Sequence, residues 1–122
     1  MPQRIQLSRR KGWRLQEISP GAVKVDRTTK WGNPFKIGSR YVRGYAKNYR
    51  ALYGIVRDQA HSVELFAEQI RGRYWARLGF GPGEIAQLRG KDLACWCKPG
   101  DPCHADILIE IANRPIGTVP ND

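Results

Sequence analysis

Three cysteines and a histidine stand close together near the C-terminal end of this 122-residue chain. They are Cys95, Cys97, Cys103 and His104. A thiolate is both a nucleophile and a metal ligand, and a neighbouring imidazole can take up or return its proton. Residues 93–104 are therefore where the sequence concentrates groups that could do chemistry.

Three interpretations of these residues are open. In the first, Cys103 is a nucleophile or a ligand-contacting thiol assisted by His104. Cys95, Cys97 and Asp101 then have supporting roles. In the second, the three thiols and the imidazole hold a tetrahedral zinc ion, for which they have the right number and kind of ligand atoms, although Cys-x-Cys is tighter than the usual spacing. In the third, the cysteines are small buried hydrophobic residues, and His104 forms a hydrogen bond near a helix start.

The pattern around this cluster predicts a strand that leads directly into a helix. Residues 92–97 are expected to form the last strand of the chain. Asp101 is a good N-cap and Pro102 suits the first helical position, with Asn113 near the end of the helix. Cys103 would then lie in the first turn, where the helix dipole favours a thiolate and the negative charge of Asp101 opposes it.

A second group of polar and aromatic residues occupies residues 27–35, with the sequence Arg-Thr-Thr-Lys-Trp-Gly-Asn-Pro-Phe. Its cations, hydroxyls, indole and amide could hold a phosphate and stack on, or hydrogen-bond to, a base. The candidate substrate-binding residues are Arg27, Lys30, Trp31 and Asn33. The alternative is a tight turn in which Trp31 and Phe35 fill the core.

The positive charge of the chain is concentrated in its first half. Residues 1–60 carry fourteen Lys and Arg against three acidic groups, giving +11, whereas residues 61–122 carry seven against eight, giving −1. Tryptophans and tyrosines are interleaved with the cations. This combination favours a polyanionic partner, a nucleotide or nucleic acid, because phosphates attract the cations and bases stack on the rings. The alternative is a solvated basic face.

The composition, 41% hydrophobic and 26% charged residues, is typical of an ordinary globular protein. We expect one domain over residues 1–115 and a mobile tail over residues 116–122. No run of residues is apolar enough to span a membrane or to act as a secretion signal, and an odd number of crowded cysteines suits a reducing compartment. These features predict a cytoplasmic protein without a membrane partner, and they specify neither a cofactor nor an oligomeric state.

The remaining pattern predicts a small α/β domain, a mixed sheet of about four strands with helices packed on it and the site on its C-terminal strand-loop-helix unit. Strands are expected over residues 4–7, 22–25, 51–57 and 92–97. Helices are expected from the cap Asp58 to Arg77, between Pro82 and Gly90, and from Pro102 to Asn113. Residues 28–37 are expected to form a shaped loop, and residues 38–50 a loop or a frayed helix. His61, near a helix start, is expected to be exposed or capping, without a functional role.

The two segments taken together resemble the bacterial and phage family called domain of unknown function 4326. The resemblance is carried by residues 27–35, 90–97 and 103–106, with Lys-Trp-Gly-Asn-Pro-Phe most characteristic, and it extends from residue 4 to residue 113. This chain has Asp26 where the family usually has Gly, and residues 38–50 look expanded. A fainter similarity, a strand followed by Cys-His at a helix start, links the chain to domain of unknown function 488. Both resemblances point to Cys103 and His104 without implying a reaction.

From these observations we expect a small enzyme that acts on a nucleotide or nucleic acid through Cys103 and His104. The alternative is a non-catalytic nucleic-acid-binding module whose cysteines and histidine are structural or bind zinc. A third hypothesis is a protein that binds a host or phage partner through its basic half.

Overall fold

The computed structural model describes residues 2–71 and 78–114, and it confirms the α/β class. Its elements are β1 (Arg4–Gln6), α1 (Leu15–Ile18), β2 (Val23–Lys24), β3 (Arg40–Tyr45), β4 (Ala51–Ile55), α2 (Gln59–Arg71), the 3-10 helix η2 (Ile85–Leu88), β5 (Leu93–Cys95) and α3 (His104–Ala112). The predicted extension of a helix to Arg77 and the predicted tail over residues 116–122 lie outside the described residues. Helix α1 is a single helical turn that was not predicted from the sequence.

A three-stranded parallel sheet has the order β1-β5-β2. β5 lies in the middle of this sheet, and Leu93, Ala94 and Cys95 are all buried, as expected for a central strand of a parallel sheet. The three predicted strands at these places are confirmed, although each is shorter than expected. Trp96 and Cys97 lie beyond the end of β5, so the predicted strand ends two residues early.

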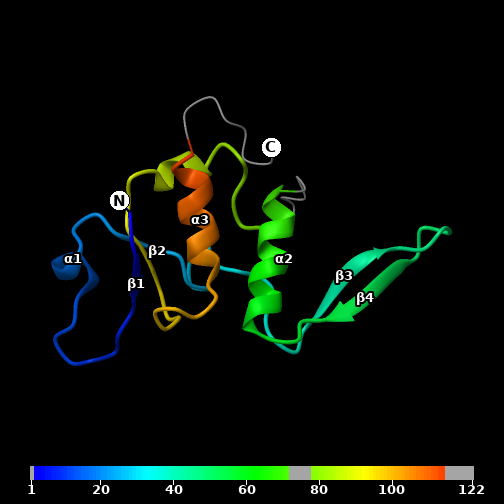
Figure 1. The fold of residues 1–122 in the computed structure, drawn as a ribbon, viewed down its shortest axis with the longest axis horizontal. Coiled ribbons are helices and arrows are strands. Elements are labelled where there is room, and N and C mark those ends of the chain that lie inside the picture. The colour runs from blue at the N-terminus through cyan, green and yellow to red at the C-terminus, as the bar shows by residue number, and fades with distance from the viewer. Residues whose placement is uncertain (1, 72–77, 115–122) are drawn as a thin grey trace.

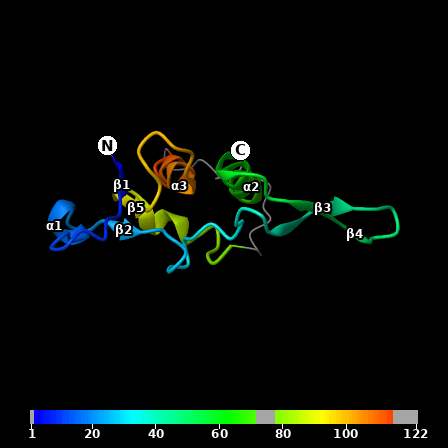
Figure 2. The same cartoon turned by 90° about the horizontal axis from the view of Figure 1, so that it is seen from below.

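Helix α3 covers this sheet, and α2 packs beside α3. Helix α3 packs against β1, β5, η2 and α2, and Figures 1 and 2 show α2 and α3 side by side. The predicted cap of α2 is confirmed, since the Asp58 carboxylate accepts the backbone N–H of His61 at 2.8 Å. Leu65, Phe66 and Ile70 form the buried stripe of α2 and pack in one hydrophobic core with Leu108 of α3. The buried faces of α2 and α3 therefore belong to one hydrophobic core.

The prediction for residues 38–50 is wrong, because this segment contains strand β3. β3 pairs with β4 in an antiparallel hairpin that is separate from the parallel sheet and projects from one end of the molecule (Figures 1 and 2). The register shifts between Val42 and Gly44, where a glycine accommodates the bulge. Tyr49, with φ of 64°, lies in the turn. The tyrosines have helical spacing, but pairing with β4 makes this segment a strand. β4 was correctly predicted as a strand, but it was expected in the main sheet.

Candidate functional site

A pocket of about 490 Å³ lies at the carboxyl end of β5, where ligands usually bind to parallel α/β sheets. It is lined by Asp26, Arg27, Thr28 and Asn33 from the loop after β2, by Gln59 at the start of α2, and by Cys95, Trp96, Cys97, Lys98, Asp101, Pro102 and His104. The two segments singled out in the sequence are about 60 residues apart along the chain. The fold brings parts of both into the wall of this one pocket.

The turn between β5 and α3 is held by Arg4 of β1. Its guanidinium donates to the backbone oxygens of Lys98 and Asp101, at 2.9 and 2.8 Å, and forms an ion pair with Asp106 at 2.9 Å. The turn itself is closed by the backbone N–H of Asp101, which donates to the oxygen of Lys98, and Gly100 adopts a positive φ of 87°. The Arg4 side chain is largely buried and does not line the pocket. It holds in place the turn that forms one wall of the pocket.

The predicted start of the last helix is wrong by two residues. Helix α3 begins at His104, and Cys103 occupies the N-cap position in an extended conformation, with φ of −150° and ψ of 138°. Asp101, which was predicted to cap the helix, lies in the preceding turn and Pro102 lies outside the helix. The physical reason is that Arg4 holds the backbone of the turn in place through residues 98 and 101. Cys103 therefore does not lie in the first helical turn.

His104 is buried and fixed in orientation. Its Nε2 lies 2.6 Å from the backbone oxygen of Val25, so Nε2 carries the proton that it donates there. Nδ1 then has a free lone pair and lies 4.0 Å from the sulfur of Cys103. The ring also packs edge-on against Phe66, with centroids 5.2 Å apart. The packing and the hydrogen bond direct Nδ1 toward the thiol, as the sequence hypothesis requires.

The three cysteines form one cluster, which we call the cysteine cluster. The ligand atoms of Cys95, Cys97 and Cys103 all lie within 4.8 Å of one another, and the sulfurs of Cys95 and Cys103 are 3.0 Å apart. The hydrogen bond to Cys95, together with burial, raises the pKa of Cys103 to about 12, and burial raises the pKa of Cys97 to about 11. The hydrogen bond from Cys103 lowers the pKa of Cys95. Cys103 is only 1% exposed, so it is a buried and protonated thiol at neutral pH.

The loop after β2 is shaped by buried polar contacts. The Asn33 amide donates to the Ser62 hydroxyl at 2.9 Å and accepts the backbone N–H of Phe35, so its polar atoms already have partners. Gly32 is required by a close approach, since a Cβ there would lie 2.7 Å from the Cα of Arg27. Arg27 is exposed at the pocket and donates through Nε to the backbone oxygen of Asn33. Of the predicted substrate-binding residues, Arg27 and Asn33 line the pocket.

The other two predicted substrate-binding residues lie elsewhere. Trp31 is 6% exposed and packs against Phe80, with centroids 4.8 Å apart. Lys30 forms an ion pair with Glu84 at 2.5 Å and lies over the Trp31 ring. Both residues line a separate open hollow beside β2. The alternative interpretation, in which the tryptophan and Phe35 fill the core, describes this part of the loop.

Two residues at the pocket were not identified from the sequence as functional. Trp96 is 41% exposed, its indole donates to the Asp26 carboxylate at 3.0 Å, and the Arg9 guanidinium lies 4.4 Å from its ring. Asp26 also accepts the Thr28 hydroxyl at 2.5 Å. Burial alone would raise the pKa of Asp26, but the hydrogen bonds from Thr28 and Trp96 lower it below its ordinary value. Two features of the sequence could have identified these residues as functional. Trp96 stands between two cysteines, and Asp26 replaces the glycine that is usual in the resembled family.

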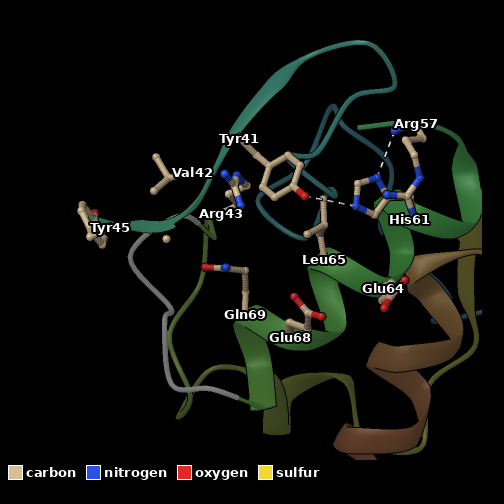
Figure 3. Close-up of a pocket in the computed structure, with 11 residues that line it drawn as sticks. Tyr41, Val42, Arg43, Tyr45, Arg57, His61, Glu64, Leu65, Glu68 and Gln69 are labelled. Atoms are coloured by element: carbon tan, nitrogen blue, oxygen red, sulfur yellow. Dashed lines mark hydrogen bonds between the residues drawn. The ribbon is translucent and has the colours of Figure 1, made fainter. Parts of the chain in front are cut away.

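A second cleft, of about 500 Å³, separates the hairpin from α2. Figure 3 shows the Tyr41 hydroxyl directed toward His61, whose Nε2 is 3.4 Å away, while His61 Nδ1 accepts the backbone N–H of Arg57 at 3.0 Å. His61 is buried, so the expectation that it is exposed is wrong. The other expectation, a capping contact, corresponds to the hydrogen bond from the backbone N–H of Arg57 just before α2. Arg43 and Arg57 also line this cleft, but Glu64 and Glu68 on its helix side balance their charge, so the cleft offers no net positive charge to a polyanion.

The hairpin belongs to a stretch of uniformly positive charge. Residues 27–57 contain eight Lys and Arg and no Asp or Glu. At the turn, Lys47, Tyr49 and Arg50 are exposed, and Tyr49 is 89% exposed. Nearer the body, the Arg40 guanidinium lies 4.2 Å from the exposed ring of Tyr53. The projecting hairpin therefore presents cations and aromatic rings to the solvent.

Comparison with known proteins identifies the family and nothing closer. None of the helices within residues 2–71 and 78–114 is long and apolar enough to cross a membrane. No curated protein and no solved structure matches the chain. The model of the family described as a domain of unknown function, DUF4326, matches residues 5–114, which is nearly the whole chain. The protein therefore belongs to the DUF4326 family, as the resemblance of its two segments predicted.

Proposed function

We propose that this protein binds nucleic acid and takes one nucleotide unit into the pocket beside Trp96. The observation that carries the proposal is the exposed Trp96 ring, which lies in a pocket lined by residues of both characteristic segments. The cations Arg9, Arg27 and Lys98 are close to the same ring or line the same pocket. An aromatic ring flanked by cations suits a nucleotide, because the base stacks on the ring and the phosphate meets the positive charge.

The hairpin supports a polymeric ligand over a free nucleotide. Its turn carries Lys47 and Arg50 beyond the body of the molecule, so they can contact phosphates away from the pocket (Figure 1). A nucleotide in a pocket of about 490 Å³ cannot reach that turn, whereas the backbone of an oligonucleotide can. Two-stranded β-ribbons are an established way to contact nucleic acids. The proposed partner is therefore DNA or RNA.

Replacing Trp96 tests the pocket. Trp96→Ala is expected to weaken the binding of a labelled single-stranded oligonucleotide, measured by fluorescence anisotropy at low salt, by about 5- to 150-fold. The reason is that stacking of one base contributes about 1–3 kcal/mol. Trp96→Phe is the matched control, because it keeps an aromatic ring for stacking while it removes the indole N–H that donates to Asp26 and reduces the ring in size. Equal losses in the two variants would contradict stacking, and no binding at low salt by the unaltered protein would refute the proposal.

A second candidate function is thiol chemistry at Cys103. The lone pair of His104 Nδ1, 4.0 Å from the sulfur, favours it because the imidazole can accept the thiol proton. Burial of the sulfur opposes it.

Alkylation distinguishes this candidate from binding alone. With the pKa of Cys103 raised to about 12, the metal-free protein is expected to react with iodoacetamide at neutral pH far more slowly than free cysteine, because the thiolate is the reacting species. Peptide mass spectrometry assigns the rate to each cysteine. A rate for Cys103 above that of free cysteine would favour thiol catalysis and contradict the protonated, buried state.

A further inference from the structure

We propose that the cysteine cluster and Nδ1 of His104 bind one Zn²⁺ ion between the end of β5 and the start of α3. The three sulfurs lie within 4.8 Å of one another. In a tetrahedral site with Zn–S distances of about 2.3 Å, neighbouring sulfurs are about 3.8 Å apart. The closest pair, Cys95 and Cys103, is at 3.0 Å. Shifts of less than about 1 Å in these side chains would therefore give each sulfur its distance to a shared ion.

The sulfur of Cys97 also has a hydrogen-bond donor that suits a thiolate. The side-chain amide of Gln59 donates to Cys97, with nitrogen and sulfur 3.7 Å apart. A neutral thiol is a weak acceptor and gains little from such donors, whereas a metal-bound thiolate is stabilised by them. The Gln59 amide would therefore stabilise a metal-bound sulfur at Cys97.

His104 has the orientation of a metal ligand. Its Nε2 donates to the backbone oxygen of Val25 at 2.6 Å, so in the neutral imidazole Nδ1 is the nitrogen with the lone pair. Metal-binding histidines typically donate their other ring N–H to a backbone oxygen or a carboxylate in this way. Nδ1 lies 4.0 Å from the sulfur of Cys103. It is not among the ligand atoms that all lie within 4.8 Å of one another, so the ring would move toward the cluster to bind the shared ion. Three sulfurs and one nitrogen complete a four-coordinate site, which is typical of structural zinc.

The surrounding charge is compatible with this ligand set. Three thiolates and one Zn²⁺ leave a net charge of −1, and the Arg4 guanidinium acts on Cys97 with its positive charge. The ion would close the loop from Cys95 to Cys103 and join the central strand to α3. It would thereby stabilise one wall of the pocket. This structural role does not depend on whether the protein binds nucleic acid.

The test is metal analysis of the full-length protein. We expect about one zinc per chain after purification without chelator. After removal of the zinc, we expect Co²⁺ to give the visible d–d bands of a tetrahedral site and near-ultraviolet thiolate charge-transfer bands. Cys97→Ser changes the most exposed of the three cysteines and is expected to lose most of this binding while retaining the fold, checked by circular dichroism. Two results would overturn the proposal. One is a reduced, folded protein that binds neither Zn²⁺ nor Co²⁺, and the other is a purified protein in which Cys95 and Cys103 form a disulfide.

The chain offers a matched pair for the fourth ligand. His61 and His104 are both 6% exposed and lie near the starts of α2 and α3, but only His104 is next to the sulfurs. His104→Gln is expected to weaken Zn²⁺ binding, measured by competition with a chelating dye, by more than about tenfold, and His61→Gln is expected to leave it unchanged. Equal affinities in the two variants would remove His104 from the site. Because no nucleic acid is present, these results are independent of the function proposed above.

Discussion

Removing one positive charge from the turn of the β3–β4 hairpin is expected to change how nucleic-acid binding depends on salt. Each phosphate contact releases counterions, so the slope of log K against log salt is about −0.9 per contact on duplex DNA and about −0.7 on a single strand. Arg50 is exposed, and no acidic residue occurs between residues 27 and 57 to compete for it. Arg50→Gln should therefore make the slope shallower by about 0.9 on a duplex, and Lys47→Gln combined with it should double the effect.

The assay is fluorescence anisotropy with one labelled oligonucleotide at four or more salt concentrations between about 50 and 200 mM, the range over which phosphate contacts change affinity strongly. Lys91→Gln is the control. Lys91 is exposed, and its replacement removes the same charge. It directly precedes β5, which lies far from the hairpin in Figure 2. Equal slopes for Arg50→Gln and the unaltered protein would refute phosphate contact at the turn. Equal effects of Arg50→Gln and Lys91→Gln would show that only net charge matters.

Two further predictions concern the pocket wall. Gly32→Ala is expected to lower the free energy of unfolding by about 1–3 kcal/mol, because the added Cβ would lie 2.7 Å from the Cα of Arg27. Gly83→Ala, whose Cβ would meet nothing within 4 Å, is the control in the same urea titration, and equal losses would contradict the steric argument. Asp26→Asn is expected to make the melting temperature decrease less steeply as the pH falls into the acid range. Although burial acts in the opposite direction, hydrogen bonds lower the pKa of Asp26 below 3.8, so its contribution is present above that pH and is lost as the pH falls through the lowered value. A melting temperature that falls equally in both proteins between about pH 5 and pH 2 would contradict this assignment.

Local sequence signals predicted the elements that depend on local contacts. Asp58 caps α2, and the apolar run at residues 93–95 forms a buried strand, because capping and burial patterns act over a few residues. The glycine and proline of residues 28–37 indicated the shaped loop for the same reason. Where the local signal was ambiguous, at residues 38–50, the outcome depended on β4, and the tyrosine spacing misled.

The start of α3 shows how a distant residue can override a local cap. Asp101 and Pro102 have the composition of a helix start, yet Arg4, almost 100 residues earlier, binds the backbone of their turn and the helix begins at His104. Helix caps contribute only about 0.5–2 kcal/mol, so tertiary contacts of this kind can shift a boundary by two residues. The spacing of residues carried no information about this contact.

What the sequence determined by itself was the kind of chemistry available: a group of thiols with an imidazole, a second polar and aromatic segment, and a strongly basic first half. What only the tertiary structure decided was which of these groups share a pocket. It brought Arg27 and Asn33 to the cysteine segment, placed Trp31 in the core, and exposed Trp96 at the pocket instead. The reason is that residue types and short-range periodicity specify local conformation, whereas a pocket is formed by contacts between segments that are distant in sequence.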